Sequence, residues 1–349
     1  METVFVTGAG GYIGSVLVPK LLQQGYKVKA LDRYFFGRDK LPLHPHLEII
    51  QEDARCVSLD TLKNVDYLID LVAVSNDPSG ELFSEATWQI NHASRAKMAT
   101  LAKKVGVKRY ILPSSCSIYG FQDDLVDETA TTNPLTVYAK ANEKAEKDVH
   151  ALADDQFVVT IMRQATVFGY SPRMRFDLAI NGMVYGAFKN KVLPLMRDGR
   201  QYRPMVHVQD TTDVMMLLLK ADAKHINKEI FNVGGNDNNY QLGSLGDIVA
   251  NEVSTQLNTP IHIEWYGDID HRSYKVNFDK IEKTLSFKPA WDARRGVREI
   301  IEKLVNHALE KSTETITLDW YKELEKWQKI VKQVEMYGGM LNIEKEIHG

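Results

Sequence analysis

The chain has 349 residues, of which 44% are hydrophobic and 26% charged, and its formal net charge is −3. This length allows about two domains or one large α/β unit, and the composition excludes a disordered chain. The weak negative charge gives no attraction to nucleic acid or to an anionic membrane, and no apolar run reaches the ~20 residues that cross a bilayer. Two cysteines, Cys56 and Cys116, are too few for a disulfide framework. Because the N-terminus lacks a signal-peptide pattern, we expect a cytoplasmic globular protein.

Short apolar strands alternate with helical stretches in the first half of the chain. The pattern predicts strands at 4–7, 28–32, 47–51, 67–72, 109–115 and 157–163, and helices at 12–24, 86–105 and 138–153. Pro19 lies inside the first of these helices, where it removes one backbone hydrogen bond and favours a bend. Strands that alternate with helices indicate an α/β fold with a Rossmann-type, doubly wound parallel sheet.

The alternation stops after about residue 169. Strands are predicted at 206–207 and 230–233, returning to the first sheet, and helices at 244–256 and 292–309. We therefore expect a Rossmann domain over 1–169, with returning segments near 204–235. A smaller, discontinuous α/β substrate domain would comprise 170–203 and 236–312, and a helical extension would cover 313–349.

An amphipathic helix is predicted over 317–336 in that extension. Its apolar side chains recur near helical spacing and are Leu318, Tyr321, Leu324, Trp327, Ile330 and Val331. The opposite face mixes both charge signs, so the apolar face is expected to pack on the body or on a partner subunit rather than on a membrane.

A glycine-rich turn follows the first strand, with Gly8, Gly11 and Gly14 at three-residue spacing. Such a turn lets the backbone approach a pyrophosphate at the N-terminus of the following helix. The next strand ends in Asp32, where a carboxylate would bind the ribose hydroxyls of a dinucleotide. The same carboxylate would repel a 2′-phosphate, which favours NAD over NADP, although the guanidinium of Arg33 beside it could hold that phosphate.

Three features in order resemble the extended short-chain dehydrogenase/reductase family, and within it the nucleotide-sugar epimerases and dehydratases. They are the Gly-x-x-Gly-x-x-Gly turn, Ser114-Ser115 at the end of a strand, and Tyr138 at the start of a helix. The resemblance covers about residues 3–310. It implies NAD as cofactor, a nucleotide-diphosphate sugar as substrate, and a homodimer formed by the helices at 86–105 and 138–153. We expect neither a nucleic-acid nor a membrane partner, and no metal site.

The resemblance also implies the residues that contact each ligand. Those expected to bind the cofactor are Gly8, Gly11, Tyr12, Ile13, Gly14, Asp32, Arg33, Asp53, Ala54, Leu71, Val72, Ala73, Ser75, Asn91, Tyr138, Asn142 and Ala165. Those expected to bind the substrate are Asn76, Ser115, Thr166, Asn181, Arg203 and Arg272. For Asn91 the alternative is an interior helical residue with a backbone partner.

The resemblance assigns catalysis to Tyr138, which would take a proton from a sugar hydroxyl, and to Ser115, which would relay it. The family motif has a lysine four residues after the tyrosine, but this chain has Asn142 there. An amide can bond the cofactor ribose, yet it supplies no positive charge to favour the phenolate. Either another cation enters the site, or the proton acceptor is weaker, or activity is reduced.

The two residues after Ser115 narrow the reaction. The related 4,6-dehydratases carry Asp-Glu there, whereas this chain has Cys116 and Ser117. Cys116 is a candidate acid/base if its pKa is lowered, and otherwise a small packing residue. Without a carboxylic acid, an epimerase that works through a 4-keto intermediate is favoured. A 4-oxidase, a 4-keto reductase, an atypical dehydratase and a non-catalytic NAD-binding regulator are the alternatives.

Overall fold

The structure is a computed structural model that describes residues 1–268 and 273–336. Its main element is a parallel sheet with the strand order β11-β7-β5-β4-β1-β2-β3. The strands are β1 (Thr3–Thr7), β2 (Lys27–Asp32), β3 (Leu47–Gln51), β4 (Tyr67–Asp70), β5 (Arg109–Ser115), β7 (Val158–Gln164) and β11 (Glu229–Val233). The order reverses between β1 and β4, which is where open parallel sheets bind their ligands. The predicted doubly wound sheet is confirmed.

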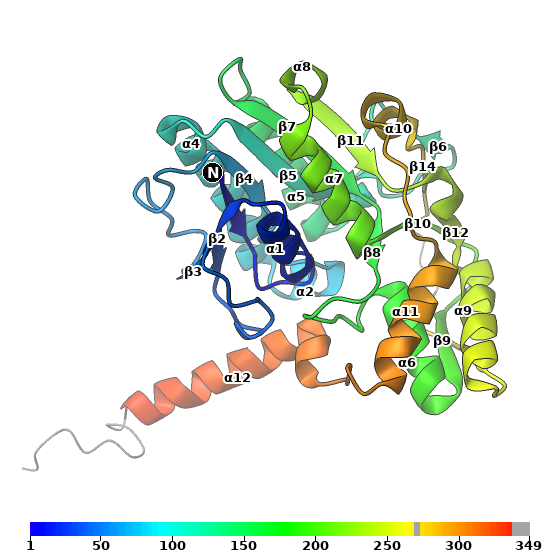
Figure 1. The fold of residues 1–349 in the computed structure, drawn as a ribbon. Coiled ribbons are helices and arrows are strands. Elements are labelled where there is room, and N and C mark those ends of the chain that lie inside the picture. The colour runs from blue at the N-terminus through cyan, green and yellow to red at the C-terminus, as the bar shows by residue number, and fades with distance from the viewer. Residues whose placement is uncertain (269–272, 337–349) are drawn as a thin grey trace, which may run out of the picture.

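Helices cover both faces of this sheet (Figure 1). On one face lie α1 (Gly14–Gln23) and α7 (Val208–Lys220), and on the other α4 (Arg95–Val105) and α5 (Val137–His150). Successive strand residues point to opposite faces, so Val4 and Val6 pack in the α1/α7 core while Phe5 packs in the α4/α5 core.

The helix predicted over 86–105 is divided in the structure. It consists of α3 (Ser84–Thr87), a π-helical segment η1 (Trp88–Ser94) and α4. Short elements lie before and after these pieces: α2 (Asp77–Leu82), η2 (Cys116–Tyr119) and β6 (Leu125–Val126). Hydropathy periodicity could not show the break, because a π-turn changes the backbone hydrogen bonding without changing which residues are apolar.

A second layer of smaller sheets and helices lies beside the main sheet and has its own apolar core. Its strands are β8 (Thr166–Phe168), β9 (Val192–Met196), β10 (Tyr202–His207), β12 (Asn239–Gln241), β13 (His262–Tyr266) and β14 (Lys275–Val276). Its other elements are α6 (Ala179–Asn190), η3 (Asn236–Asn238), α9 (Leu242–Leu257), α11 (Ala293–Val305) and η4 (Thr313–Thr315). Two further short helices, α8 (Ala223–Ile226) and α10 (Asp279–Leu285), pack instead against β7 and β11 of the main sheet.

Of the two strands expected to return to the first sheet, only one does so among the described residues. β11 pairs with β7, as predicted. β10 pairs instead with β8 and β12, so that expectation was wrong. A short apolar run shows that a strand is buried but does not show which partner it pairs with.

The predicted C-terminal helix is α12 (Thr317–Met336), and it projects from the body in Figure 1. Its first turns contact the loop after β2: Trp320 Nε1 donates to the Phe35 carbonyl oxygen at 2.7 Å. Tyr321 packs against the rings of Phe36 and Phe83. In the part of the chain that the structure describes, no helix combines the length and apolarity that a membrane crossing requires.

Candidate active site

A cleft of about 1660 Å³ lies where the main sheet's strands end, and several elements contribute to its walls. Gly8 follows β1, Asp32 ends β2, Leu71 follows β4, Ser115 ends β5 and Ala165 follows β7, and all of them line the cleft. The loop before α6 and the side of α12 complete the walls. Because parallel strands end at the same edge, one cleft collects residues that are far apart in sequence.

The glycine turn has no room for side chains. A Cβ on Gly8, whose φ is +63°, would lie 2.9 Å from the carbonyl carbon of Leu71, and one on Gly14 would lie 2.4 Å from the Gly8 carbonyl oxygen. The turn therefore requires glycine both for its backbone conformation and for the close approach of α1 to the sheet. The N-terminus of α1 then lies at the cleft with its positive dipole end.

Asp32 is held in place by the backbone around it. Its Oδ2 accepts a hydrogen bond from the Gly10 N–H at 3.0 Å, and its Oδ1 accepts one from the Tyr34 N–H at 2.8 Å. Burial raises the pKa of this carboxyl, and the two N–H groups oppose that effect. Arg33 stacks over Phe35 and pairs with Asp53 at 3.3 Å, so its guanidinium already has an anionic partner.

Most of the predicted cofactor residues line the cleft. These are Gly8, Gly11, Tyr12, Ile13, Gly14, Asp32, Arg33, Asp53, Ala54, Leu71, Val72, Ala73, Ser75, Tyr138 and Ala165. Asn91 does not line it. Its amide accepts from the Val74 N–H at 2.8 Å and donates to the Val74 carbonyl oxygen at 3.0 Å. Asn91 thus ties η1 to the loop after β4, which matches the alternative of an interior residue with a backbone partner.

Tyr138 and Ser115 meet inside the cleft. Tyr138 lies in the first turn of α5, where the Thr136 hydroxyl caps the helix by accepting from the Ala139 N–H at 3.1 Å. Ser115 accepts from the Ser117 N–H at 3.1 Å, which leaves its own proton free to donate. The neighbouring Ser115 hydroxyl lowers the pKa of the Tyr138 phenol, but burial has the larger effect and raises that pKa above the ordinary value.

Asn142, which was expected to bind the cofactor, is not among the residues that line the cleft. It is 1% exposed, and both ends of its amide are engaged. Its Oδ1 accepts from Arg95 Nη1 at 2.7 Å, and its Nδ2 donates to the Tyr138 carbonyl oxygen at 3.0 Å. A cation therefore does enter this region, from α4 rather than from α5.

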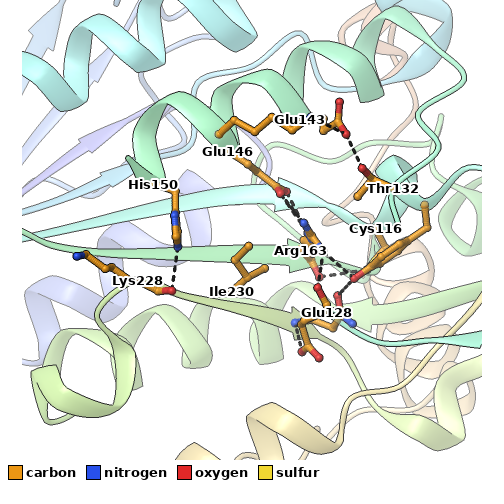
Figure 2. Close-up of polar contacts among 12 residues, drawn as sticks. Cys116, Glu128, Thr132, Glu143, Glu146, His150, Arg163, Lys228 and Ile230 are labelled. Atoms are coloured by element: carbon orange, nitrogen blue, oxygen red, sulfur yellow. Dashed lines mark hydrogen bonds and ion pairs between the residues drawn. The ribbon is translucent and has the colours of Figure 1, made fainter. Parts of the chain in front are cut away.

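Cys116 is also not in the cleft, which corrects its assignment as a catalytic residue. Its thiol donates to the Arg163 carbonyl oxygen at 3.1 Å, beside the buried Arg163–Glu146 ion pair (Figure 2). The side chain is fully buried, and burial raises the pKa of the thiol far above its usual range. A thiol that stays protonated and faces the core is a packing residue.

Some of the predicted substrate residues line the cleft, and others do not. Asn76, Ser115, Thr166 and Arg203 line the cleft. Asn181 is buried elsewhere: its Nδ2 donates to the Tyr12 hydroxyl at 3.1 Å, and its Oδ1 accepts from the Gly169 N–H at 2.9 Å. It therefore positions Tyr12 rather than contacting a ligand. Arg272 lies outside the described residues.

Among the cleft residues that the sequence analysis missed are the arginines Arg173 and Arg175, in the loop before α6. Arg175 forms a two-point ion pair with Asp177 at 2.8 and 3.0 Å. Arg173 stacks on Phe36, and its Nε has no acceptor among the described residues. Burial and the like charge of Arg175 lower the pKa of Arg173 to about 10. A bound anion would offset this charge. Arg173 and Arg175 are two residues apart in a loop that carries no motif, so nothing in the sequence pattern indicated that they line the cleft.

Within residues 1–268 and 273–336, no group of three or more His, Cys, Asp or Glu side chains is placed to hold a metal ion.

Comparison with known proteins places this geometry in a family. The model of the NAD dependent epimerase/dehydratase family matches residues 4–234. UDP-glucuronic acid decarboxylase 2 from Arabidopsis thaliana is 28% identical over 312 residues, which are 84% of this chain and 66% of that relative. The chain thus spans about two thirds of the length of that protein.

Solved structures share the fold. A UDP-glucuronic acid 4-epimerase from Bacillus cereus, in complex with UDP-glucuronic acid and NAD, superimposes with a TM-score of 0.79 at 20% identity, covering 88% of this chain and 100% of that one. A dTDP-glucose 4,6-dehydratase from Streptomyces venezuelae, with NAD and TYD bound, gives 0.77 at 22% identity, covering 88% and 98%. At these identities the likeness concerns architecture, and it confirms the Rossmann-type fold.

Proposed function

Because the chain belongs to the NAD dependent epimerase/dehydratase family, a family of enzymes that use NAD, we propose that it is a nucleotide-sugar 4-epimerase working through a 4-keto sugar. The observation that carries the proposal is that Tyr138 and Ser115 both line the cleft that begins at the glycine turn. A phenol and a hydroxyl in this arrangement can remove the proton of a sugar hydroxyl as its carbon is oxidised, and return it later.

The residues present fit NAD. The turn from Gly8 to Gly14 offers backbone N–H groups to a pyrophosphate, and Asp32 offers a carboxylate to ribose hydroxyls. The buried, incompletely bonded Arg173 favours a ligand with negative charge. When bound, NAD supplies the reversible oxidation of an alcohol. Asp32 would disfavour a 2′-phosphate by like charge, and Arg33, already paired with Asp53, is less available to hold one.

The acid groups favour epimerisation over 4,6-dehydration. Dehydration needs a group to protonate the leaving C6 hydroxyl and another to take the C5 proton, whereas epimerisation at C4 needs neither. Cys116 faces the core, and Ser117 lines the cleft with a buried hydroxyl that has no partner among the described residues. Asp77 lines the cleft and raises the Tyr138 pKa, so it is one carboxylate that an atypical dehydratase could use.

Arg203 supports a nucleotide-diphosphate substrate. It lines the cleft from β10, and a planar guanidinium suits a diphosphate. Thr166 and Asn76 line the same cleft, although Asn76 already donates to Asp177 at 2.8 Å. We also propose a homodimer through α4 and α5 and a substrate domain over 170–203 and 236–312.

Product analysis tests the proposal. The purified protein is incubated with NAD and, separately, with UDP-glucose, UDP-glucuronic acid, UDP-N-acetylglucosamine and dTDP-glucose. An epimerase converts at least one of them to its 4-epimer with catalytic NAD. One equivalent of reduced cofactor for each oxidised sugar would identify a 4-oxidase. Conversion of a 4-keto sugar only when reduced cofactor is added would identify a reductase. An inert cofactor with every sugar would favour a regulator.

A further inference from the structure

Arg95 is a buried cation that the tyrosine motif does not predict. It is the first residue of α4, directly after the π-helical segment η1, and it lines the cleft although it is only 2% exposed. Its Nε donates to the Val72 carbonyl oxygen at 3.1 Å, and its Nη1 donates to Asn142 Oδ1 at 2.7 Å. These two bonds fix the guanidinium between the cleft wall and α5.

The charge of Arg95 is not offset by a carboxylate in contact with it. Within residues 1–268 and 273–336, Arg95 forms no ion pair, and its bonds go to a carbonyl and an amide, both neutral. Arg175 differs, because Asp177 neutralises it through two short bonds. Asp70, a buried carboxylate at the end of β4, does not pair with Arg95. It accepts hydrogen bonds from the hydroxyls of Thr7 and Tyr110 instead. The field of Arg95 therefore reaches the cleft.

The charged and polar groups around Tyr138 come from four elements. Arg95 lies on α4, Asp77 at the start of α2, Arg175 in the loop before α6, and Ser115 at the end of β5. Arg95, Ser115 and Arg175 lower the Tyr138 pKa, while burial and Asp77 raise it. Among the groups that lower it, Arg95 has the largest effect. Asp77 accepts the Thr136 hydroxyl at 2.6 Å, which holds it near the start of α5.

We propose that Arg95, anchored by Asn142, supplies the positive charge beside Tyr138 that residue 142 itself does not carry. The inference rests on the proposed function, since it concerns the proton acceptor of that reaction. Asn142 then has a specific reason to be an amide: its Oδ1 accepts from Arg95, whereas a lysine at 142 would put two cations in one buried pocket. Arg95 is a positioning residue that acts through Tyr138, and residues 95 and 142 form one unit.

The test is a titration of Tyr138 that needs no sugar. The ultraviolet difference between each protein and its Tyr138→Phe counterpart, both with NAD added, isolates this one phenol. Arg95→Gln keeps a donor for Asn142 and removes the charge, so the Tyr138 midpoint should rise by about one pH unit or more. Arg95→Lys keeps the charge and should leave the midpoint within a few tenths of a pH unit. Lys140→Gln removes an exposed cation from the same helix, and should also leave it unchanged.

The double variant Arg95→Gln/Asn142→Lys returns one cation to the pocket from the other helix, so its midpoint should fall back toward the native value. This recovery distinguishes the charge of Arg95 from its packing. A lysine at position 142 restores the charge but not the packing contacts of the Arg95 side chain, so a purely structural role would give no recovery. A folded Arg95→Gln with the native midpoint would overturn the proposal. If Arg95→Gln does not fold, the double variant decides: a midpoint one pH unit or more above the native one would equally overturn it.

Turnover gives the second readout once a substrate is known. At neutral pH, kcat of Arg95→Gln should fall about tenfold for each pH unit of midpoint shift, with KM little changed. The two proposals fail separately. A shifted midpoint with no sugar converted would retain the role of Arg95 and reject the epimerase, and a converted sugar with an unshifted midpoint would do the reverse.

Discussion

At the scale of single residues, the chemistry depends on a phenol whose environment opposes its ionisation. Burial raises the Tyr138 pKa, and three neighbours counter it only in part. A base that must be deprotonated to act, with a pKa above its ordinary value, is more active at higher pH. Turnover of the native protein should therefore rise from neutral toward alkaline pH.

Replacing Tyr138 tests this directly. Tyr138→Phe removes the proton acceptor, so turnover should fall by about 10²–10⁴-fold, while the ring and its packing remain. NAD affinity, measured by fluorescence titration, should change little. Tyr67→Phe is the matched control, since Tyr67 begins β4 at the far end of the sheet from the cleft. Full activity in Tyr138→Phe would rule out this mechanism.

Asp32 determines the cofactor preference. Its carboxylate would face the 2′-phosphate of NADP, so the native protein should bind NAD more tightly. Asp32→Ala should weaken NAD binding and reduce the preference, because it removes both the ribose acceptor and the repulsion. Asp60→Ala, at an exposed position, should alter neither affinity. Isothermal titration with both cofactors measures this, and tighter NADP binding by the native protein would contradict it.

The sequence predicted most of the cleft but not how its polar side chains pair. Gly8 and Asp32 were found because turn glycines and strand ends have characteristic spacings, and Ser115 and Tyr138 were found through the resemblance to the family. Asn142 and Cys116 are buried outside the cleft lining, which the sequence did not predict, because burial and orientation depend on neighbours that are distant in sequence. Arg95 lies four residues after Asn91, a spacing that places two side chains on one helical face, and this was the available signal.

At the scale of elements, the π-helical segment η1 connects the cleft wall to the α4/α5 layer. Asn91 lies within it and bonds both backbone groups of Val74, and Arg95 follows directly after it. Pro19, by contrast, lies within α1 without ending that helix. Strand positions followed from apolar runs, but the pairing of β10 did not, since its partners β8 and β12 are set by the second core.

Asn91→Ala tests the structural role of η1. The substitution leaves the Val74 N–H and carbonyl groups without their partners, and each buried unsatisfied group costs about 1–3 kcal/mol. The free energy of unfolding should therefore drop by about 2 kcal/mol or more in urea titrations. Gln89→Ala changes an exposed residue of the same segment η1, two positions before Asn91. This control substitution should lower the free energy of unfolding by well under 1 kcal/mol. Equal stability of the two variants would contradict the assignment.

At the scale of the whole molecule, α4 and α5 lie together on one face of the sheet, where the proposed dimer would form. Ala141 belongs to the buried interior, whereas Leu101 and Val105 are partly buried against the α4/α5 core. A homodimer is expected in light scattering at micromolar concentration. A strictly monomeric mass there would refute it.

The central claim is that the configuration at C4 of a nucleotide sugar is inverted without exchange of any carbon-bound hydrogen with solvent. The most direct measurement is nuclear magnetic resonance of the products formed in D2O with NAD from the four nucleotide sugars. An epimerase gives a 4-epimer with no deuterium on carbon, because the C4 hydrogen leaves and returns within the site. Deuterium at C5 or C6, with loss of water or of a carboxyl group, would contradict the claim and identify a dehydratase or a decarboxylase.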